Sequence, residues 1–185
     1  MAKVLVPLAK GFEEIEAISV IDILRRGGVG VVTASISDNR EVEGAHGITV
    51  AADALFADVA DDQYEAIVLP GGGEGTENLR ACERLIERLR RQHEEGLLMC
   101  AICAAPTVLV DAGVADEGRH MTCYPSMMME LDRPYSDVPV VADGNLITGQ
   151  GPGAAVLFGL VVLKTLEGES KARKIARSMI TDVLG

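Results

Sequence analysis

The chain has 185 residues, of which 48 % are hydrophobic and only 3 % aromatic, so its core must be aliphatic. Its formal net charge is −11, from 17 basic and 28 acidic residues. This excess of acid opposes non-specific binding to nucleic acid and adsorption to anionic membranes. The length suits one domain over residues 1–185, and no linker, repeat or low-complexity segment divides it.

The hydropathy of the sequence does not suggest a membrane protein. The first residues enter a strand pattern directly and lack the apolar core and cleavage site of a secretory leader. The longest uncharged apolar run, residues 97–110, contains Pro106 and is too short to span a bilayer. We therefore expect a cytoplasmic protein.

Strand and helix patterns alternate along the chain. The first half predicts strands at residues 3–8, 29–36 and 65–69, a hairpin at 42–51, and helices at 13–26 and 77–95. The second half predicts a strand from residue 97, a helix from about 104, a short strand at 120–123 and a helical turn at 126–131. A hairpin at 138–148, an apolar helix from 151 to about 166 and an amphipathic helix at 170–184 follow. This alternation is typical of an α/β fold with a largely parallel sheet covered on both faces.

The run LLMCAICAAPTVLV at residues 97–110 places Cys103 at a bend between a buried strand and a buried helix. Small residues stand two positions before and after Cys103, as glycines flank the serine in the hydrolase turn G-x-S-x-G. The helix start would aim free N–H groups and a positive dipole end at the sulfur, which favours the thiolate. The local pattern is equally compatible with a plain buried cysteine, because free Cys is among the most buried residue types.

The remaining cysteines and the histidines give weaker signals. Cysteines stand at 82, 100, 103 and 123 and are expected to be free thiols rather than a disulfide framework. Cys100-x-x-Cys103 resembles a redox dithiol, but Cys100 lies inside the strand and should point away from Cys103. Histidines at 46, 93 and 120 form no ligand spacing, so no metal site is predicted.

Three turns should meet where parallel strands end: residues 9–13, the glycine turn 70–73, and the bend at Cys103. At about 100° per residue, Glu14 falls on the polar side of the first helix, whereas Glu16 falls between Val20 and Ile23 on the apolar side. Burial favours the neutral form of a carboxyl group, which could donate a hydrogen bond to a thiolate. The alternative is that these first-turn glutamates only complement the helix dipole.

The glycine turn does not match a nucleotide-binding loop. Thr76 stands where G-x-G-x-x-G needs its last glycine, no G-K-[ST] follows, and Glu74 and Glu77 would repel phosphate. The Gly72 N–H could instead pair with the Ala104 N–H as two donors to an oxyanion. The alternative is an ordinary turn without a chemical role.

Four motifs taken together give a specific resemblance: GFEEIEA near the start, VLPGGGEGTENL, AICAAP at the bend, and GQGPGA near the end. In this order, and over essentially the whole chain, they resemble the ThiJ/PfpI superfamily. Within it the chain is most similar to the single-domain YajL-like branch, which includes relatives of the parkinsonism-associated protein deglycase. The resemblance implies a flavodoxin-like three-layer sandwich with a nucleophile elbow, a homodimer, and no cofactor. It assigns Cys103 as the nucleophile, Glu16 as its protonated partner, and Gly72 and Ala104 as backbone donors.

The sequence also departs from that superfamily. Tyr124 stands where the human branch has a histidine, and Ala104 stands where protease-type members have one, which disfavours a Cys-His protease. His46 occupies the place of an arginine near the dimer partner's site, although a solvated loop histidine is the simpler interpretation. Tyr124, His46, Gly151 and Pro152 are the expected pocket residues beside Cys103.

Two functions from different classes fit these residues. In the first, Cys103 attacks small reactive aldehydes such as methylglyoxal, with Glu16 moving protons, so that the protein is a slow cofactor-independent glyoxalase or deglycase producing lactate. In the second, the protein is a non-enzymatic sensor of oxidative stress or a redox-regulated chaperone, working through oxidation of Cys103 to sulfinic acid. Both depend on the same reactive thiol, so the sequence does not separate them.

Overall fold

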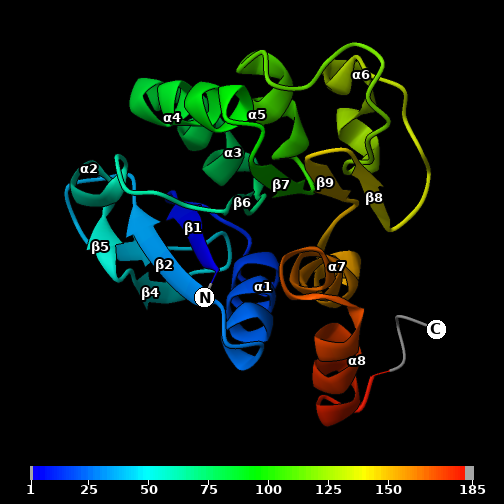
Figure 1. Cartoon of the computed structure of the whole chain (residues 1–185). Coiled ribbons are helices and arrows are strands. Elements are labelled where there is room, and N and C mark those ends of the chain that lie inside the picture. The colour runs from blue at the N-terminus through cyan, green and yellow to red at the C-terminus, as the bar shows by residue number, and fades with distance from the viewer. Residues whose placement is uncertain (1, 182–185) are drawn as a thin grey trace.

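The computed structural model describes residues 2–181, and a seven-stranded sheet runs through its centre (Figure 1). Its strands are β1 Lys3–Leu8, β2 Gly30–Ser35, β5 Ala54–Leu55, β6 Ala66–Leu69, β7 Leu98–Ile102, β8 Val140–Asp143 and β9 Leu146–Gly149. Their order across the sheet is β5-β2-β1-β6-β7-β9-β8, and only β8 is antiparallel to its neighbour. Two further strands, β3 Glu41–Glu43 and β4 Thr49–Ala51, form a separate antiparallel hairpin.

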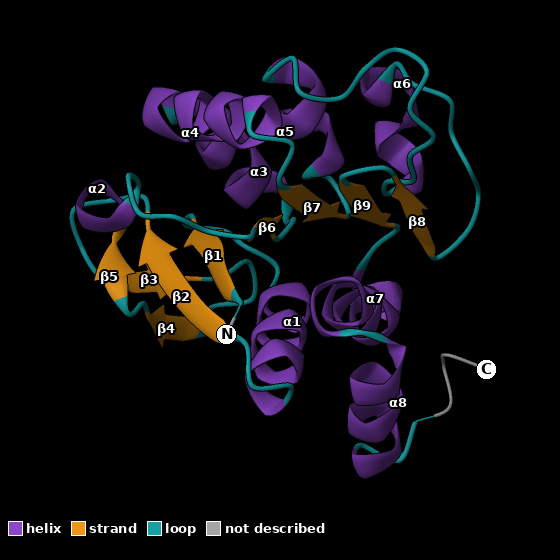
Figure 2. Cartoon of the chain, viewed as in Figure 1, coloured by secondary structure: helices purple, strands orange, loops and turns teal. Residues whose placement is uncertain are grey.

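Helices cover both faces of the sheet, which gives three layers (Figure 2). One face carries α1 Glu14–Arg26, α7 Ala155–Glu167 and α8 Glu169–Ser178. The other carries α2 Phe56–Val59, α3 Gly73–Ala81, α4 Glu83–Glu94, α5 Pro106–Asp111 and α6 Met128–Leu131. Successive strand residues point to opposite faces, so Val4 and Val6 pack in one aliphatic core while Leu5 packs in the other. The α/β, mostly parallel architecture predicted from the sequence is therefore confirmed.

The predicted helix at 77–95 is wrong as a single element. The chain forms α3 and α4, separated at Cys82, whose φ of −82° and ψ of 90° are extended rather than helical. The Cys82 carbonyl accepts hydrogen bonds from the Leu85 and Ile86 N–H groups and so starts α4. No proline or glycine marks this break, and the apolar spacing runs through it, so it could not be predicted from the sequence.

Three smaller elements also differ from expectation. Residues 120–123 form no regular strand, because Met121 makes only an isolated bridge to Tyr135. The last helix ends at Ser178 rather than 184, and positions 182–184 of that prediction lie outside the described residues. The short β5 and α2 were not predicted, since two strand residues and one helical turn carry no periodicity. No helix within residues 2–181 is long and apolar enough to cross a membrane.

Candidate active site

Cys103 lies directly after β7 in a backbone conformation that side chains rarely adopt, with φ of +65°. Its N–H donates to the Gly149 carbonyl at 2.9 Å, and its carbonyl accepts from the Tyr124 N–H at 2.8 Å. These bonds join the bend to the end of β9 and to the loop before α6. A left-handed non-glycine residue costs about 1–3 kcal/mol and persists only where the surroundings enforce it. The elbow predicted at this position is therefore present, and it leaves the Cys103 side chain half-buried.

Glu16 projects from the first turn of α1 into the same place and is only 1 % exposed. Its Oε2 accepts a 2.8 Å hydrogen bond from the Gly71 N–H, and the Cys103 thiol is near enough to affect the pKa of the carboxyl group. Its Oε1 is buried and has no hydrogen-bond partner among the described residues. Burial raises the pKa of Glu16 to about 7, against the opposing effect of the Gly71 N–H. The predicted burial of Glu16 and its contact with Cys103 are both observed.

The glycine turn is packed tightly against these two groups. A side chain at Gly71 would bring its Cβ within 2.6 Å of Cys103 Cβ and 2.7 Å of Glu16 Oε2. Gly72 has φ of +95°, and a Cβ there would lie 2.3 Å from the Gly11 carbonyl oxygen. The Glu13 N–H donates to the Gly71 carbonyl at 2.9 Å. The three turns expected to meet at this edge of the sheet are thus in contact.

The surroundings of Cys103 act on its pKa in opposite directions. Burial and the Glu16 carboxylate raise the pKa of Cys103 to about 12, whereas the Gly72 and Ala104 N–H groups lower it. The two backbone N–H groups thus act against burial and the neighbouring charge. The thiolate expected at Cys103, with a neutral Glu16 beside it, stays a prediction.

Glu14 does not lie on a polar, solvated side of α1, contrary to the helical-wheel prediction. It is 6 % exposed because the loop between β3 and β4 folds over the helix start. Its Oε1 accepts from the His46 and Ile48 N–H groups, and its Oε2 lies 2.9 Å from His46 Nδ1. Burial alone would raise the pKa of Glu14, but the hydrogen bonds from His46 and Ile48 lower it to about 2.

His46 is exposed, as expected for a loop histidine, but it is bound to Glu14 rather than free. A hydrogen bond to Glu14 raises the pKa of His46. Within residues 2–181, Glu13, Glu14 and His46 form a group whose ligand atoms lie within 4.8 Å of one another, a proximity that the sequence spacing did not suggest. Both Glu14 oxygens already accept hydrogen bonds there, so we assign no metal to this group.

A pocket of about 330 Å³ lies beside the elbow and is joined to it through the Tyr124 N–H. Its lining comprises Tyr124, Pro125, Pro139, Gln150, Gly151, Pro152, Gly153 and Ala154. The structure thus brings together Tyr124, Gly151 and Pro152 as expected, but not His46. Sequence reasoning missed Pro139 and Gln150 as lining residues, although Gln150 lies within the quoted GQGPGA motif.

The other cysteines have different surroundings from Cys103. All four are free thiols, as expected. Cys100 is fully buried on the α1 and α7 side of the sheet, and burial raises its pKa. Burial also raises the pKa of Cys123 to about 11. Neither is among the groups that shift the pKa of Cys103, which are Glu16, Gly72 and Ala104 and include no histidine.

Comparison with known proteins agrees with this arrangement. The DJ-1/PfpI family model matches residues 2–165. The chain belongs to the DJ-1/PfpI family. Protein dj-1beta of Drosophila melanogaster is 41 % identical over 179 residues, covering 95 % of each chain. Glutathione-independent glyoxalase DJR-1.2 of Caenorhabditis elegans is 36 % identical over 170 residues, covering 90 % of this chain and 89 % of the relative.

Some plant relatives are longer than this chain. Protein DJ-1 homolog B of Arabidopsis thaliana is 37 % identical over 96 % of this chain, which spans 41 % of its length. Among solved structures, Drosophila melanogaster DJ-1beta superposes with a TM-score of 0.95 at 39 % identity over 98 % of each chain. The structure titled Toxoplasma gondii DJ-1, oxidized, gives a TM-score of 0.94 at 36 % identity, covering 98 % of this chain and 99 % of its own. These similarities extend the family assignment to the flavodoxin-like fold.

Proposed function

We propose that this family member acts on small reactive aldehydes, converting methylglyoxal to lactate through Cys103 and Glu16. The observation that carries the proposal is a buried carboxyl group beside a half-buried thiol on a strained elbow, with Gly71 packed against both. A relative named as a glutathione-independent glyoxalase supports the substrate class. The shift of the Glu16 pKa to about 7 suits a group that must both accept and donate protons near neutral pH.

The reaction starts with the proton on sulfur. As the Cys103 sulfur bonds to the aldehyde carbon, the thiol proton passes through the Glu16 carboxylate to the carbonyl oxygen. That oxygen becomes the hydroxyl of a hemithioacetal, and Glu16 is left ionised. Glu16 then removes the proton from this carbon and returns it to the neighbouring keto carbon through an enediol intermediate. The first carbon is thereby oxidised to a thioester and the second reduced to an alcohol, without an external oxidant. Water cleaves the thioester, which releases lactate and regenerates the thiol.

Two backbone donors assist this sequence. The Gly72 and Ala104 N–H groups lower the pKa of Cys103, which supports their assignment as donors at this site. In the addition step they stabilise negative charge at the reacting centre, where preorganised donors are most effective. None of these steps needs a metal or an organic cofactor. Because Glu16 alone serves each proton transfer, we propose a slow enzyme.

The test is lactate formation from methylglyoxal by the wild type and by a Cys103→Ser variant. We expect turnover by the wild type and a loss of at least about a thousandfold in the variant, because serine is a far weaker nucleophile here. Cys82→Ser is the matched control, since Cys82 is also a half-buried free thiol but lies between α3 and α4. Equal rates for wild type and Cys103→Ser would overturn the proposal.

A second candidate function is peroxide sensing by the same thiol. The Gly72 and Ala104 N–H groups lower the pKa of Cys103, and the same donors would bind the oxygens of a sulfinate. A structural neighbour is titled as oxidized. Two equivalents of peroxide would convert the thiol through sulfenic to sulfinic acid, releasing two waters. Intact mass after mild peroxide should show a gain of two oxygens that Cys103→Ser lacks; no gain would count against a sensor.

We also propose that the protein is a homodimer. Ile15 and Ile18 on α1, and Ile48 beside β4, are 56 %, 44 % and 57 % exposed. The Ile48 N–H donates to Glu14, which joins the two elements into one apolar surface. Sedimentation should give a dimer mass for the wild type and a monomer mass for Ile15→Glu. Ile180→Glu is the control, since Ile180 is 95 % exposed at the far end of the described chain; a wild-type monomer would refute the dimer.

A further inference from the structure

An arginine occupies a buried position on the amphipathic helix α4. The side chains of α4 that face the sheet are Leu85, Arg88, Leu89 and Gln92. Arg88 is only 4 % exposed. Within residues 2–181 no group accepts a hydrogen bond from its guanidinium, and its Nε and Nη1 are buried without a partner. A buried charge without a counter-ion is strongly unfavourable, so this arginine requires an explanation.

Packing against Tyr64 does not supply that explanation. The Arg88 guanidinium lies 5.8 Å from the centre of the Tyr64 ring, and Lys3 Nζ lies 4.8 Å from the same ring. An aromatic face attracts a cation, but it leaves all five guanidinium N–H donors without acceptors. Burial lowers the pKa of Arg88 and the charge of Arg91 adds to this effect, whereas Glu95 and Asp61 raise the pKa without a hydrogen bond to the guanidinium.

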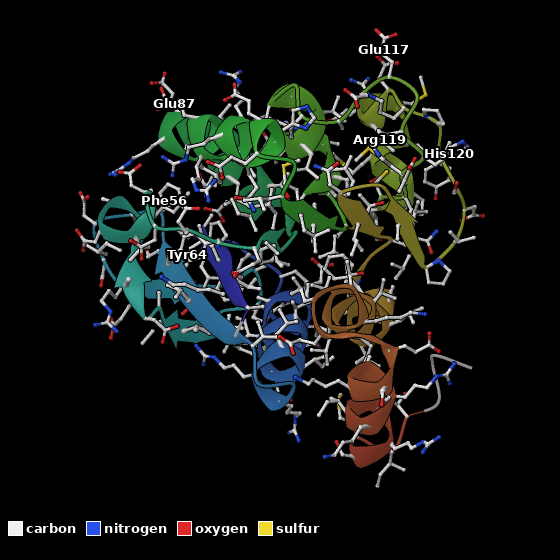
Figure 3. The ribbon with its side chains drawn as sticks, viewed as in Figure 1. Phe56, Tyr64, Glu87, Glu117, Arg119 and His120 are labelled. Carbon is white, nitrogen blue, oxygen red and sulfur yellow. The ribbon has the colours of Figure 1, made fainter. Side chains whose placement is uncertain are left out.

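The neighbouring acids are already engaged or turned outward. Asp61 accepts hydrogen bonds from Arg84 at 3.0 Å and from Arg91 at 3.2 Å. Glu87 is exposed, and Figure 3 shows it on the outer side of α4, whereas Tyr64 lies on the sheet side. Three arginines and two acids line this space, so its net charge is positive by one. Arg88 is the member whose charge no acid of the described chain neutralises through direct contact.

These residues enclose a pocket of about 260 Å³, lined by Ala60, Asp61, Arg84, Glu87, Arg88 and Arg91. This is below the roughly 300–1,000 Å³ of pockets that hold drug-sized ligands, so a small anion fits it better than a nucleotide. A guanidinium presents paired donors that match the oxygens of phosphate or carboxylate. Asp61 and Tyr64 precede β6, whereas Cys103 follows β7, so the pocket and the elbow lie toward opposite edges of the sheet.

We propose that the pocket of Arg84, Arg88 and Arg91 binds a small phosphate-bearing anion, with the Arg88 guanidinium as its principal donor. Asp61 holds Arg84 and Arg91 in position at the mouth of the pocket, and the anion completes the coordination of Arg88. This site does not depend on the aldehyde chemistry proposed for Cys103. It would link the stability or activity of the protein to the concentration of phosphate or of a phosphorylated metabolite.

The first experiment measures binding of inorganic phosphate by calorimetry and by the shift in Tm, with sodium chloride at equal ionic strength as the reference. We expect phosphate, but not chloride, to raise the Tm of the wild type. Arg88→Met keeps the length of the side chain and removes the charge, and should weaken phosphate binding at least about tenfold. Arg177→Met removes an exposed arginine from α8 and should bind phosphate like the wild type.

A second variant keeps the proposal testable if Arg88→Met does not fold. Glu87 is exposed, so Glu87→Gln should fold normally, and it removes a negative charge from the lining. We expect it to bind phosphate about two- to threefold more tightly, an effect that a purely structural Arg88 would not produce. Repeating the titration with glycerol phosphate distinguishes the sources, since tighter binding of the ester indicates a phosphorylated metabolite and tighter binding of phosphate indicates the free anion.

Two results would overturn the site. The first is an equal rise in Tm with chloride and phosphate. The second is unchanged phosphate affinity in both Arg88→Met and Glu87→Gln. In phosphate-free buffer, moreover, Arg88→Met should be at least as stable as the wild type, because it removes an unpaired buried charge. A large loss of stability there would assign Arg88 to packing against Tyr64 instead.

Discussion

Glu14 and Glu16 stand two residues apart on the first turn of α1, and both are buried, yet their protonation differs. The pKa of Glu14 is lowered to about 2, whereas that of Glu16 is raised to about 7. Burial opposes ionisation at both. The difference is that Glu14 accepts hydrogen bonds on both oxygens from the β3–β4 loop, while Glu16 accepts one from Gly71 and faces a thiol. The number of available donors, rather than burial, therefore decides which carboxyl group can exchange protons.

Within one helical turn, Glu14 therefore has a structural role and Glu16 a chemical one. The Glu14 region is saturated with donors, so its carboxylate fixes the loop over the helix start. The Glu16 region is left short of donors, which keeps a proton available beside Cys103. Changes at the two glutamates should accordingly affect different measurements.

The largest effect expected from changing either glutamate is the loss of turnover at Glu16. Glu16→Gln keeps the shape of the side chain but cannot accept the thiol proton, so kcat/KM for methylglyoxal should fall by about 100- to 1,000-fold. Glu14→Gln is the matched control and should change kcat/KM by less than about threefold. Lactate formation measures both. Similar losses in the two variants would remove the distinction between the two regions.

The pH dependence of the rate sharpens the same contrast. Because burial raises the pKa of Glu16 to about 7, its carboxylate form increases through neutral pH. We expect kcat/KM to rise about tenfold per unit below pH 7 and to level off above it. The residual activity of Glu16→Gln should lack this step. A wild-type profile that is flat between pH 5 and 9 would contradict Glu16 as the base.

Stability should respond to Glu16 in the opposite direction from an ordinary carboxylate. The pKa of Glu16 is raised in the folded protein. Its contribution to the free energy of unfolding is therefore complete below 4.5, the pKa in the unfolded chain, and is lost as pH rises through about 7. The shift corresponds to about 3 kcal/mol in the free energy of unfolding. Urea denaturation of wild type and Glu16→Gln at pH 4 and pH 8 should show this difference. If the difference in free energy of unfolding between the two proteins is the same at pH 4 and pH 8, Glu16 is not protonated in the folded protein.

The contribution of Glu14 to stability should depend on pH in the opposite direction. The pKa of Glu14 is lowered in the folded protein. Its contribution to the free energy of unfolding is therefore present above 4.5, the pKa in the unfolded chain, and is lost as pH falls toward about 2. At pH 7, Glu14→Gln should reduce the free energy of unfolding by about 1–3 kcal/mol, because it weakens the charge-assisted bonds to the loop. The same urea measurement at pH 3 should find a smaller deficit. An equal deficit at both values would assign the effect to packing alone.

The sequence predicted the parts of this site that depend on strand and helix periodicity. Cys103 was predicted at the end of a buried strand and Glu16 on the buried side of a helix, and both positions follow from spacing along one element. The position of Glu14 could not be predicted in this way, since it depends on the loop of a distant hairpin. Gly44 lets that loop approach, because a Cβ there would lie 2.4 Å from Glu14 Oε1.

The full set of effects on the Cys103 thiol was also beyond the sequence. The helix start gave a reason to expect a thiolate, and the Gly72 and Ala104 N–H groups do lower the pKa of Cys103. The competing effects, desolvation and the Glu16 charge, arise only when the three turns are packed together. The unpaired Arg88 was missed for a related reason, since the mixed charges of α4 gave no sign that one arginine faces the sheet.

The smallest expected effect is that of His46, which contacts Glu14 from solvent. His46→Gln keeps the backbone N–H that donates to Glu14 Oε1 and removes only the ring contact at 2.9 Å. The hydrogen bond to Glu14 raises the pKa of His46, so its contribution is complete below 6.5 and is lost as pH rises through the raised value. The variant should therefore lower Tm by no more than about 2 °C at pH 5.5 and by less at pH 9. Because the backbone donors alone should hold the pKa of Glu14 low, a large loss at both pH values would show that the loop depends on the imidazole itself.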